Sequence, residues 1–144
     1  MYQSLDLEVP TRLRIAALTG LAGLATAIAI SGLSISLPRI LPETGFHLAA
    51  LVGAGIAGFV LADGLGRPGA WGAFRAACTA LAMTLFGAWL GALLVYPPGV
   101  APFSAGALGW IMLADAATEN LTTVKLWAAA MLLLHLAAGR LRRH

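Results

Sequence analysis

Charge is scarce in this sequence, and one long stretch of the chain lacks it altogether. Asp, Glu, Lys and Arg make up 10% of the 144 residues, against roughly 25% in an ordinary soluble domain. No Asp, Glu, Lys, Arg or His occurs between Ala76 and Ala114. In a soluble domain of this length, part of such a stretch would have to face water. The absence excludes a soluble protein and predicts an integral membrane protein.

Cysteine and dense basic patches are also scarce, and each absence excludes a class of protein. The single cysteine, Cys78, rules out an internal disulfide and is interpreted as a small packing residue in an apolar segment. The net charge is +3, but the basic residues stand beside apolar runs and form no patch. This pattern is typical of membrane topology, and it excludes nucleic acid as a partner.

Four apolar runs account for most of what the sequence does contain. Hydrophobic residues make up 60% of the chain, and a membrane-crossing helix needs about 20 apolar residues. We therefore predict an all-α integral membrane protein, a four-helix transmembrane bundle that forms one domain over residues 1–144. The predicted spans are 13–35, 46–62, 74–96 and 121–139. Pro97 and Pro98 end the third span, because proline cannot continue a helix.

A fifth apolar segment, about 103–117, is short for a crossing. The basic residues decide its placement, because positively charged loops stay in the cytoplasm. If four spans leave both termini in the cytoplasm, only Arg39 and Lys125 lie outside. The basic residues then inside are Arg12, Arg14, Arg67, Arg75, Arg140, Arg142 and Arg143. We therefore predict a re-entrant or interfacial helical segment before the last span. The Ala-, Gly-, Leu- and Arg-rich composition points to a bacterial inner membrane.

Glycines crowd two of the predicted spans. Small residues let helices approach closely in a bilayer, so these glycines are predicted helix-packing positions, either within the bundle or against a partner. They are Gly53, Gly55 and Gly58 in the second span and Gly87 and Gly91 in the third.

Two further segments receive structural interpretations. Trp89 lies inside the third span and is expected to pack against another helix. The glycine-rich segment 64–69 resembles a nucleotide-binding motif by letter, but no strand precedes it. With Pro68 it is predicted to form a tight turn between the second and third spans.

Asp115 and Glu119 are the candidate ion or substrate contacts, together with His47. The two acids are four residues apart, so they share one face of a helix, and ionisable groups near a membrane can mark an ion or proton path. The four-span topology places His47 on the same outer side. The alternative is structural. Asn120 is predicted to cap the last helix, whose dipole the preceding acids complement.

No catalytic constellation is visible in the sequence. His135 lies near the cytoplasmic arginines and is interpreted as a structural histidine, because His47 is at the wrong depth to share a haem with it. His47 could approach Ser31, Ser34 and Ser36 in the outer half of the first span, but nothing else supports a nucleophile and base. We predict that the protein is not an enzyme and has no cofactor and no metal site.

Two functions remain open from the sequence. The first is an accessory or assembly subunit that acts through helix contacts in a larger membrane complex, with other subunits or copies of itself as partners. The second is a small homo-oligomeric transporter or channel that uses the outer segment around Asp115 and Glu119. Transport normally needs polar groups near the middle of the membrane, and the predicted spans contain few. The sequence therefore favours the first.

Overall fold

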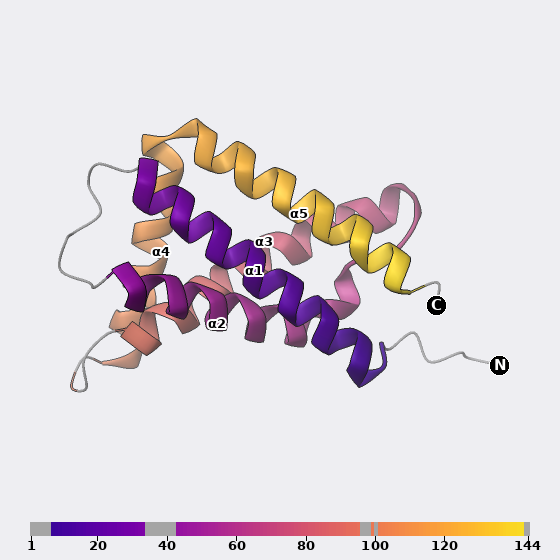
Figure 1. Cartoon of the computed structure of the whole chain (residues 1–144), viewed down its shortest axis with the longest axis horizontal. Coiled ribbons are helices and arrows are strands. Elements are labelled where there is room, and N and C mark those ends of the chain that lie inside the picture. Colours follow the sequence, from indigo (N-terminus) through magenta and orange to yellow (C-terminus); the bar gives the residue numbers. More distant parts are fainter. Residues whose placement is uncertain (1–6, 34–42, 96–98, 100, 143–144) are drawn as a thin grey trace.

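The described part of the chain forms five α-helices and one short 3₁₀-helix (Figure 1). A computed structural model describes residues 7–33, 43–95, 99 and 101–142, and no strand occurs within these ranges. The elements are α1 (Val9–Leu33), α2 (Glu43–Leu61), η1 (Ala62–Gly64), α3 (Gly69–Val95), α4 (Pro102–Glu119) and α5 (Leu121–Leu141). The predicted all-α class is therefore confirmed for the described part of the chain.

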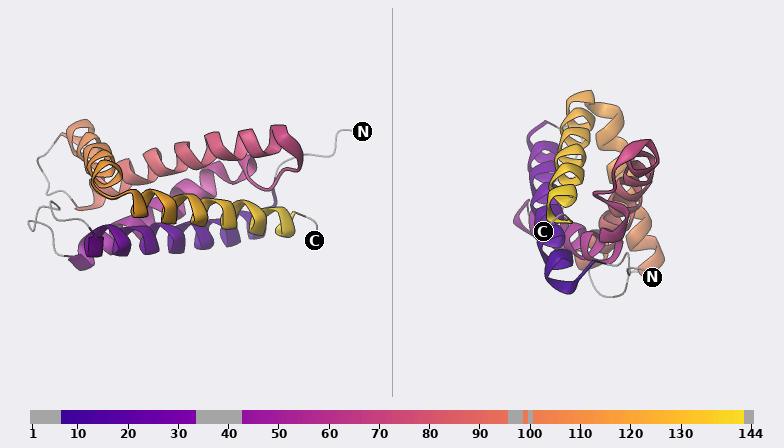
Figure 2. Two further views of the ribbon diagram at one scale, coloured as in Figure 1. Left: turned by 90° about the horizontal axis from the view of Figure 1, so that it is seen from above. Right: turned by 90° about the vertical axis from the view of Figure 1, so that its right-hand side faces the viewer.

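Four of the helices, α1, α2, α3 and α5, are long and apolar enough to cross a membrane. The longest is α3, whose 27 residues extend for about 40 Å at 1.5 Å per residue. α4 has 18 residues and is not among these candidate spans. It also runs steeply across the direction that the four long helices share (Figure 2). The prediction of four long apolar helices and one separate shorter helix is confirmed.

The long helices form a ring that is incomplete on one side. Along the chain, α1 packs on α2 and α2 on α3, while α5 returns to pack on α1. α3 and α5, in contrast, have almost no backbone contact with each other. α4 packs mainly on α3 and crosses to the start of α5 at one end of the bundle, as the end-on view in Figure 2 shows. We call the gap between α3 and α5 the open side.

Close backbone contacts between helices occur where the sequence supplies glycine. A Cβ atom added to Gly53 of α2 would lie 2.5 Å from the carbonyl oxygen of Gly87 and 3.2 Å from the Cα of Gly91, both in α3. Gly58 of α2 lies against the side chain of Thr19 of α1, whose hydroxyl oxygen would be 2.5 Å from an added Cβ. A side chain at either position would push the helices apart, so glycine sets the helix separation here.

The remaining predicted packing positions also lie between helices. A Cβ on Gly55 of α2 would stand 3.6 Å from the carbonyl oxygen of Ala16 in α1, which is ordinary contact. The indole of Trp89 occupies the space beside Gly106 of α4 and would collide with any side chain there. The prediction that Trp89 packs against another helix is confirmed.

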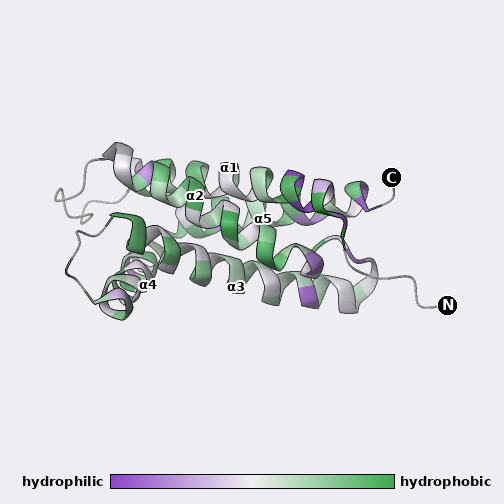
Figure 3. Cartoon of the chain, turned by 90° about the horizontal axis from the view of Figure 1, so that it is seen from below, coloured by the Kyte–Doolittle hydropathy of each residue, from purple (hydrophilic) through white to green (hydrophobic). Residues whose placement is uncertain are grey.

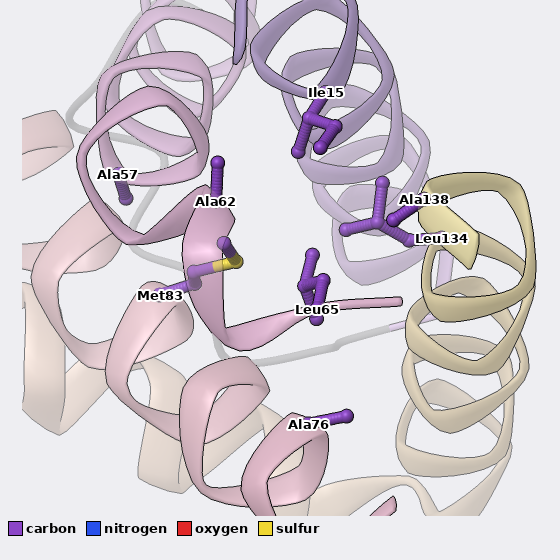
Figure 4. Close-up of a cluster of buried hydrophobic side chains, with 8 residues drawn as sticks. All are labelled: Ile15, Ala57, Ala62, Leu65, Ala76, Met83, Leu134 and Ala138. Atoms are coloured by element: carbon purple, nitrogen blue, oxygen red, sulfur yellow. The ribbon is translucent and has the colours of Figure 1, made fainter. Parts of the chain in front are cut away.

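A buried apolar cluster joins α1, α2, η1, α3 and α5 toward one end of the ring (Figure 4). Leu65, in the loop after η1, is 1% exposed and projects between the helices. It fills space that α3 and α5 do not close by direct packing. The other members are Ile15, Ala57, Ala62, Ala76, Met83, Leu134 and Ala138.

The outer surface of the long helices is apolar, and hydrophilic residues gather at one end (Figure 3). Leu21 of α1, Leu81 of α3 and Leu133 of α5 are each more than half exposed. The hydrophilic end is the one where α1 begins and α5 ends, and we call it the cluster end. The opposite end, which α4 crosses, is the α4 end.

Candidate functional site: an apolar cavity and an arginine cluster

A cavity of about 150 Å³ lies inside the helix ring. All five α-helices line it, and most of its lining residues are small, including Gly87 and Ala88 of α3. The larger lining residues include Met112 of α4, Met131 of α5 and Phe46 of α2. Apolar cavities of about this volume stay dry and accept small apolar groups. The chemistry of the cavity therefore favours a hydrocarbon side chain or tail over an ion.

The hydroxyl groups at the cavity already have partners on their own helices. Thr19, Thr26 and Thr84 each donate to the carbonyl oxygen four residues earlier, at 2.7, 2.8 and 2.7 Å. Within the described residues, no buried side-chain nitrogen or oxygen lacks a hydrogen-bond partner. The cavity wall therefore presents no unsatisfied group that would recognise a polar ligand.

Two tryptophans connect the helices around the cavity. The indole nitrogen of Trp127 in α5 donates to the Thr84 hydroxyl of α3 at 2.9 Å. It is a side-chain link across the open side, where the backbones do not pack. Trp110 of α4 donates to the carbonyl oxygen of Leu85 at 2.8 Å and holds α4 on α3. Thr84 and Trp127, which are bonded across the open side, both line the cavity, so the cavity borders the open side.

At the cluster end, the side chain of Asp63 in η1 binds the start of α1. Its carboxylate pairs with the guanidinium of Arg12 in α1 and accepts a hydrogen bond from the backbone N–H of Leu7 at 3.1 Å. Arg12 also donates to the carbonyl oxygen of Leu7 at 3.1 Å. The start of α1 is thereby tied to the end of α2.

The backbone carbonyl of Asp63 joins two more arginines to the same point. Arg67 donates to it from Nε at 3.2 Å, and Arg142, just after α5, donates from a terminal nitrogen at 2.9 Å. Arg142 also donates from Nε to the carbonyl oxygen of Leu65 at 2.8 Å. We call Arg12, Arg67 and Arg142, with Asp63 between them, the arginine cluster.

Like charges surround Arg142 in this cluster. Partial burial lowers the pKa of Arg142 below its ordinary value, and the positive charge of Arg67 lowers it further. Asp63 opposes these effects, while Arg75 and Arg12 add to them. The charged form of Arg142 is thus less favourable in the folded chain than in water.

The loop after η1 lies directly against α5. The backbone N–H of Gly66 donates to Nδ1 of His135 at 3.1 Å, so His135 has the structural hydrogen bond that was expected of it. Gly66 has φ +75°, and a Cβ there would lie 2.6 Å from the carbonyl carbon of Ala138. Only glycine meets both the backbone angle and the close approach. The predicted turn therefore also docks α2 and α3 onto α5.

The predicted contact residues lie on two helices, α2 and α4. Asp115 and Glu119 are exposed on α4, and His47 of α2 lies with Nε2 3.1 Å from the Ser31 hydroxyl of α1. Within the described residues, no three His, Cys, Asp or Glu side chains gather in a group that could hold a metal ion. Asn120 accepts a hydrogen bond from the N–H of Thr122 at 2.9 Å, which confirms it as the cap of α5.

The sequence reasoning missed both the cavity and the role of Asp63. Asp63 is the only acid between Glu43 and Asp115, and it directly follows a long apolar run. An isolated acid at the end of a candidate span, in a chain rich in arginine, was the available signal. No known protein family, curated protein or solved structure matches this chain. A functional proposal therefore rests on the fold, the cavity and the contacts of Asp63.

Proposed function

We propose that this chain is a multi-pass protein of a bacterial inner membrane, crossed by α1, α2, α3 and α5. The exposed apolar surface of these helices supports insertion, because lipid is the solvent in which such a surface is stable. α4 then lies at the outer interface and does not cross. Its exposed acids, Asp115 and Glu119, would face water or lipid headgroups there.

The charge distribution supports an orientation with the cluster end in the cytoplasm. Arginines lie at this end in the first two turns of α1 and α3, in the loop after η1 and at the end of α5. Lys125, near the start of α5, lies toward the α4 end. An excess of arginine on one side is the pattern that retains that side in the cytoplasm.

Within the membrane, we propose that the protein is an accessory subunit that acts through helix contacts in a larger complex. The observation that carries this proposal is the open side. A bundle whose third and last helices do not pack against each other, with a cavity of small residues beside the gap, is incomplete as a helix ring. Small-residue surfaces are where helices associate in lipid.

The proposed occupant of the open side is a transmembrane helix of a partner protein. The chemistry of the cavity defines that helix, because an apolar cavity of about 150 Å³ accepts a large aliphatic or aromatic side chain. Acyl chains would fill the same space when the partner is absent. A partner helix with one such residue at the level of Trp127 would complete the ring.

The experiment combines purification with site-directed cross-linking. The chain has one cysteine, Cys78, so a Cys78→Ser background allows single new cysteines at Ala88 of α3 and Met131 of α5, which both line the cavity. Each carries a photo-activated cross-linker in native membranes. The matched control is Leu21→Cys on α1, which is exposed but does not line the cavity.

We expect one integral membrane protein to co-purify in fixed stoichiometry in mild detergent. The α3 and α5 positions should cross-link to that same protein, and the α1 position to lipid only. Cross-links only to lipid at all three positions, or a chain that purifies alone, would overturn the proposal. Cross-links between copies of this chain would instead favour the homo-oligomeric transporter or channel. In that case, loss of flux in an Asp115→Asn, Glu119→Gln double variant would test the acids.

A further inference from the structure

The arginine cluster has more positive charge than its one acid can neutralise. Asp63 pairs with Arg12, but among the described residues Arg67 and Arg142 are bonded to backbone carbonyl oxygens only. Within the residues that the structure describes, neither has a carboxylate partner. Both side chains are partly buried, where a charge without a counter-ion is less stable than in water.

Shared bonding to one oxygen brings these two guanidinium groups together. Arg67 and Arg142 both donate to the carbonyl oxygen of Asp63, at 3.2 and 2.9 Å, so their donor nitrogens lie within a few ångströms of each other. A guanidinium carries five N–H donors. In the described part of the chain Arg67 uses one of them and Arg142 uses two. Most donors of the pair remain available for an acceptor.

The position of the pair matches the depth of lipid phosphates in the proposed membrane. Arg142 immediately follows α5, a helix long enough to cross, and Arg67 lies in the short loop between α2 and α3. Arg75, in the second turn of α3, is near enough to lower the pKa of Arg142. Basic pockets between helix ends on the cytoplasmic side are sites where anionic headgroups bind.

We propose that Arg67 and Arg142, supported by Arg75, form a binding site for a phosphate group, which the membrane supplies as the phosphodiester of an anionic lipid. Arginine is suited to this ligand, because its planar fork donates two parallel hydrogen bonds to phosphate oxygens. The bound anion offsets the repulsion among the arginines and leaves the Asp63–Arg12 pair unchanged. The site rests on membrane insertion but is independent of any partner on the open side.

The experiment measures lipid binding to the purified full-length chain by native mass spectrometry after delipidation in detergent. Three probes are titrated separately: phosphatidylglycerol, zwitterionic phosphatidylcholine and inorganic phosphate. The test variants are Arg67→Gln and Arg67→Lys, which leave the bonds of Arg142 to the loop in place. Lys125→Gln is the matched control, because it removes the same charge near the opposite end of α5.

We expect the unmodified chain to bind phosphatidylglycerol about tenfold more tightly than phosphatidylcholine. Arg67→Gln should weaken phosphatidylglycerol binding about tenfold, the effect of losing one strong charged hydrogen bond. The affinity of Arg67→Lys for phosphatidylglycerol should lie between those of the unmodified chain and Arg67→Gln. The affinity of Lys125→Gln should stay within about twofold of the unmodified chain. Competition by inorganic phosphate at the same site would identify free phosphate as a second source of the ligand.

Two results would overturn the phosphate site. One is equal binding of phosphatidylglycerol and phosphatidylcholine by the unmodified chain. The other is an equal loss of phosphatidylglycerol binding in Arg67→Gln and Lys125→Gln, which would show an effect of net charge alone. If Arg67→Gln fails to fold, Arg67→Lys is compared with the unmodified chain instead, because it keeps the charge and removes the guanidinium fork. Neither result bears on the cross-links from positions 88 and 131, so the two proposals fail separately.

Discussion

Asp63 shows how one residue can organise one end of a helix bundle. Its carboxylate binds α1 through Arg12, and its carbonyl oxygen binds Arg142 at the end of α5. The partners are 51 and 79 residues away in the chain. Local sequence patterns do not relate positions at such separations. The same carboxylate is also the negative charge that opposes the lowered pKa of Arg142.

Asp63→Asn should therefore destabilise the protein far more than the same change at Asp115. The amide keeps the shape of the side chain but removes the charge paired with Arg12, which we expect to lower the free energy of unfolding by about 1 to 3 kcal/mol. Asp115→Asn, on an exposed position of α4, should change it by less than about 0.5 kcal/mol. Unfolding in mixed detergent micelles measures both. Equal effects would show that Asp63 is not a structural hub.

At the scale of the helix, the effect of replacing a glycine depends on whether the glycine touches another helix. Gly53 of α2 faces the backbone of α3 at a distance that excludes a methyl group. Gly32, near the end of α1, is different, because a Cβ added there would meet no atom within 4 Å. A glycine-to-alanine substitution therefore tests helix packing at Gly53 and intrinsic helix propensity at Gly32.

Gly53→Ala and Gly32→Ala should have effects of opposite sign. At Gly53 the added methyl must push α2 and α3 apart, and we expect a loss of about 1 to 3 kcal/mol in unfolding free energy. At Gly32 the added methyl meets no neighbour, so alanine should stabilise α1 by up to about 1 kcal/mol. Unfolding in mixed detergent micelles measures the change in unfolding free energy for both variants. A neutral Gly53→Ala would contradict the close α2–α3 contact.

The elements themselves were predictable from composition, and their arrangement was not. Uncharged runs and the Asn120 cap mark where the helices lie, because each acts locally on the backbone, whereas the predicted stop at Pro97 and Pro98 lies outside the described residues. The open side was not predictable. In lipid, a face that meets another helix and a face that meets acyl chains are both apolar, so hydropathy cannot tell which pairs of helices pack.

The candidate site was predicted less well than the helices, for a related physical reason. The acids that stand out in the sequence, Asp115 and Glu119, are exposed on α4. The cavity consists of residues such as Gly87 and Ala88 that carry no chemical signal of their own. A space lined by small side chains exists only once five helices are placed, and no single segment encodes it.

At the scale of the whole molecule, the proposed orientation can be tested from both ends of the bundle. In a Cys78→Ser background, Thr118→Cys on α4 should react with a membrane-impermeant maleimide added outside intact cells. Pro68→Cys, in the loop at the cluster end, should react only after the membrane is permeabilised. Both positions are exposed, so accessibility of the thiol alone does not distinguish them. The reverse pattern would invert the topology and move the arginine cluster outside, against the positive-inside rule.

The pairing of α5 with α1 has a consequence for how the protein is made. Helices α1, α2 and α3 can pack in order as they leave the ribosome, since each contacts the one before it. The side of α1 that receives α5 must wait until α5 has been synthesised. Until then Gly66 has no His135 to bond, and Asp63 has Arg12 but not Arg142. Among the helix contacts described, the pairing of α1 with α5 therefore forms last during synthesis, after a three-helix intermediate in which that side of α1 is uncovered.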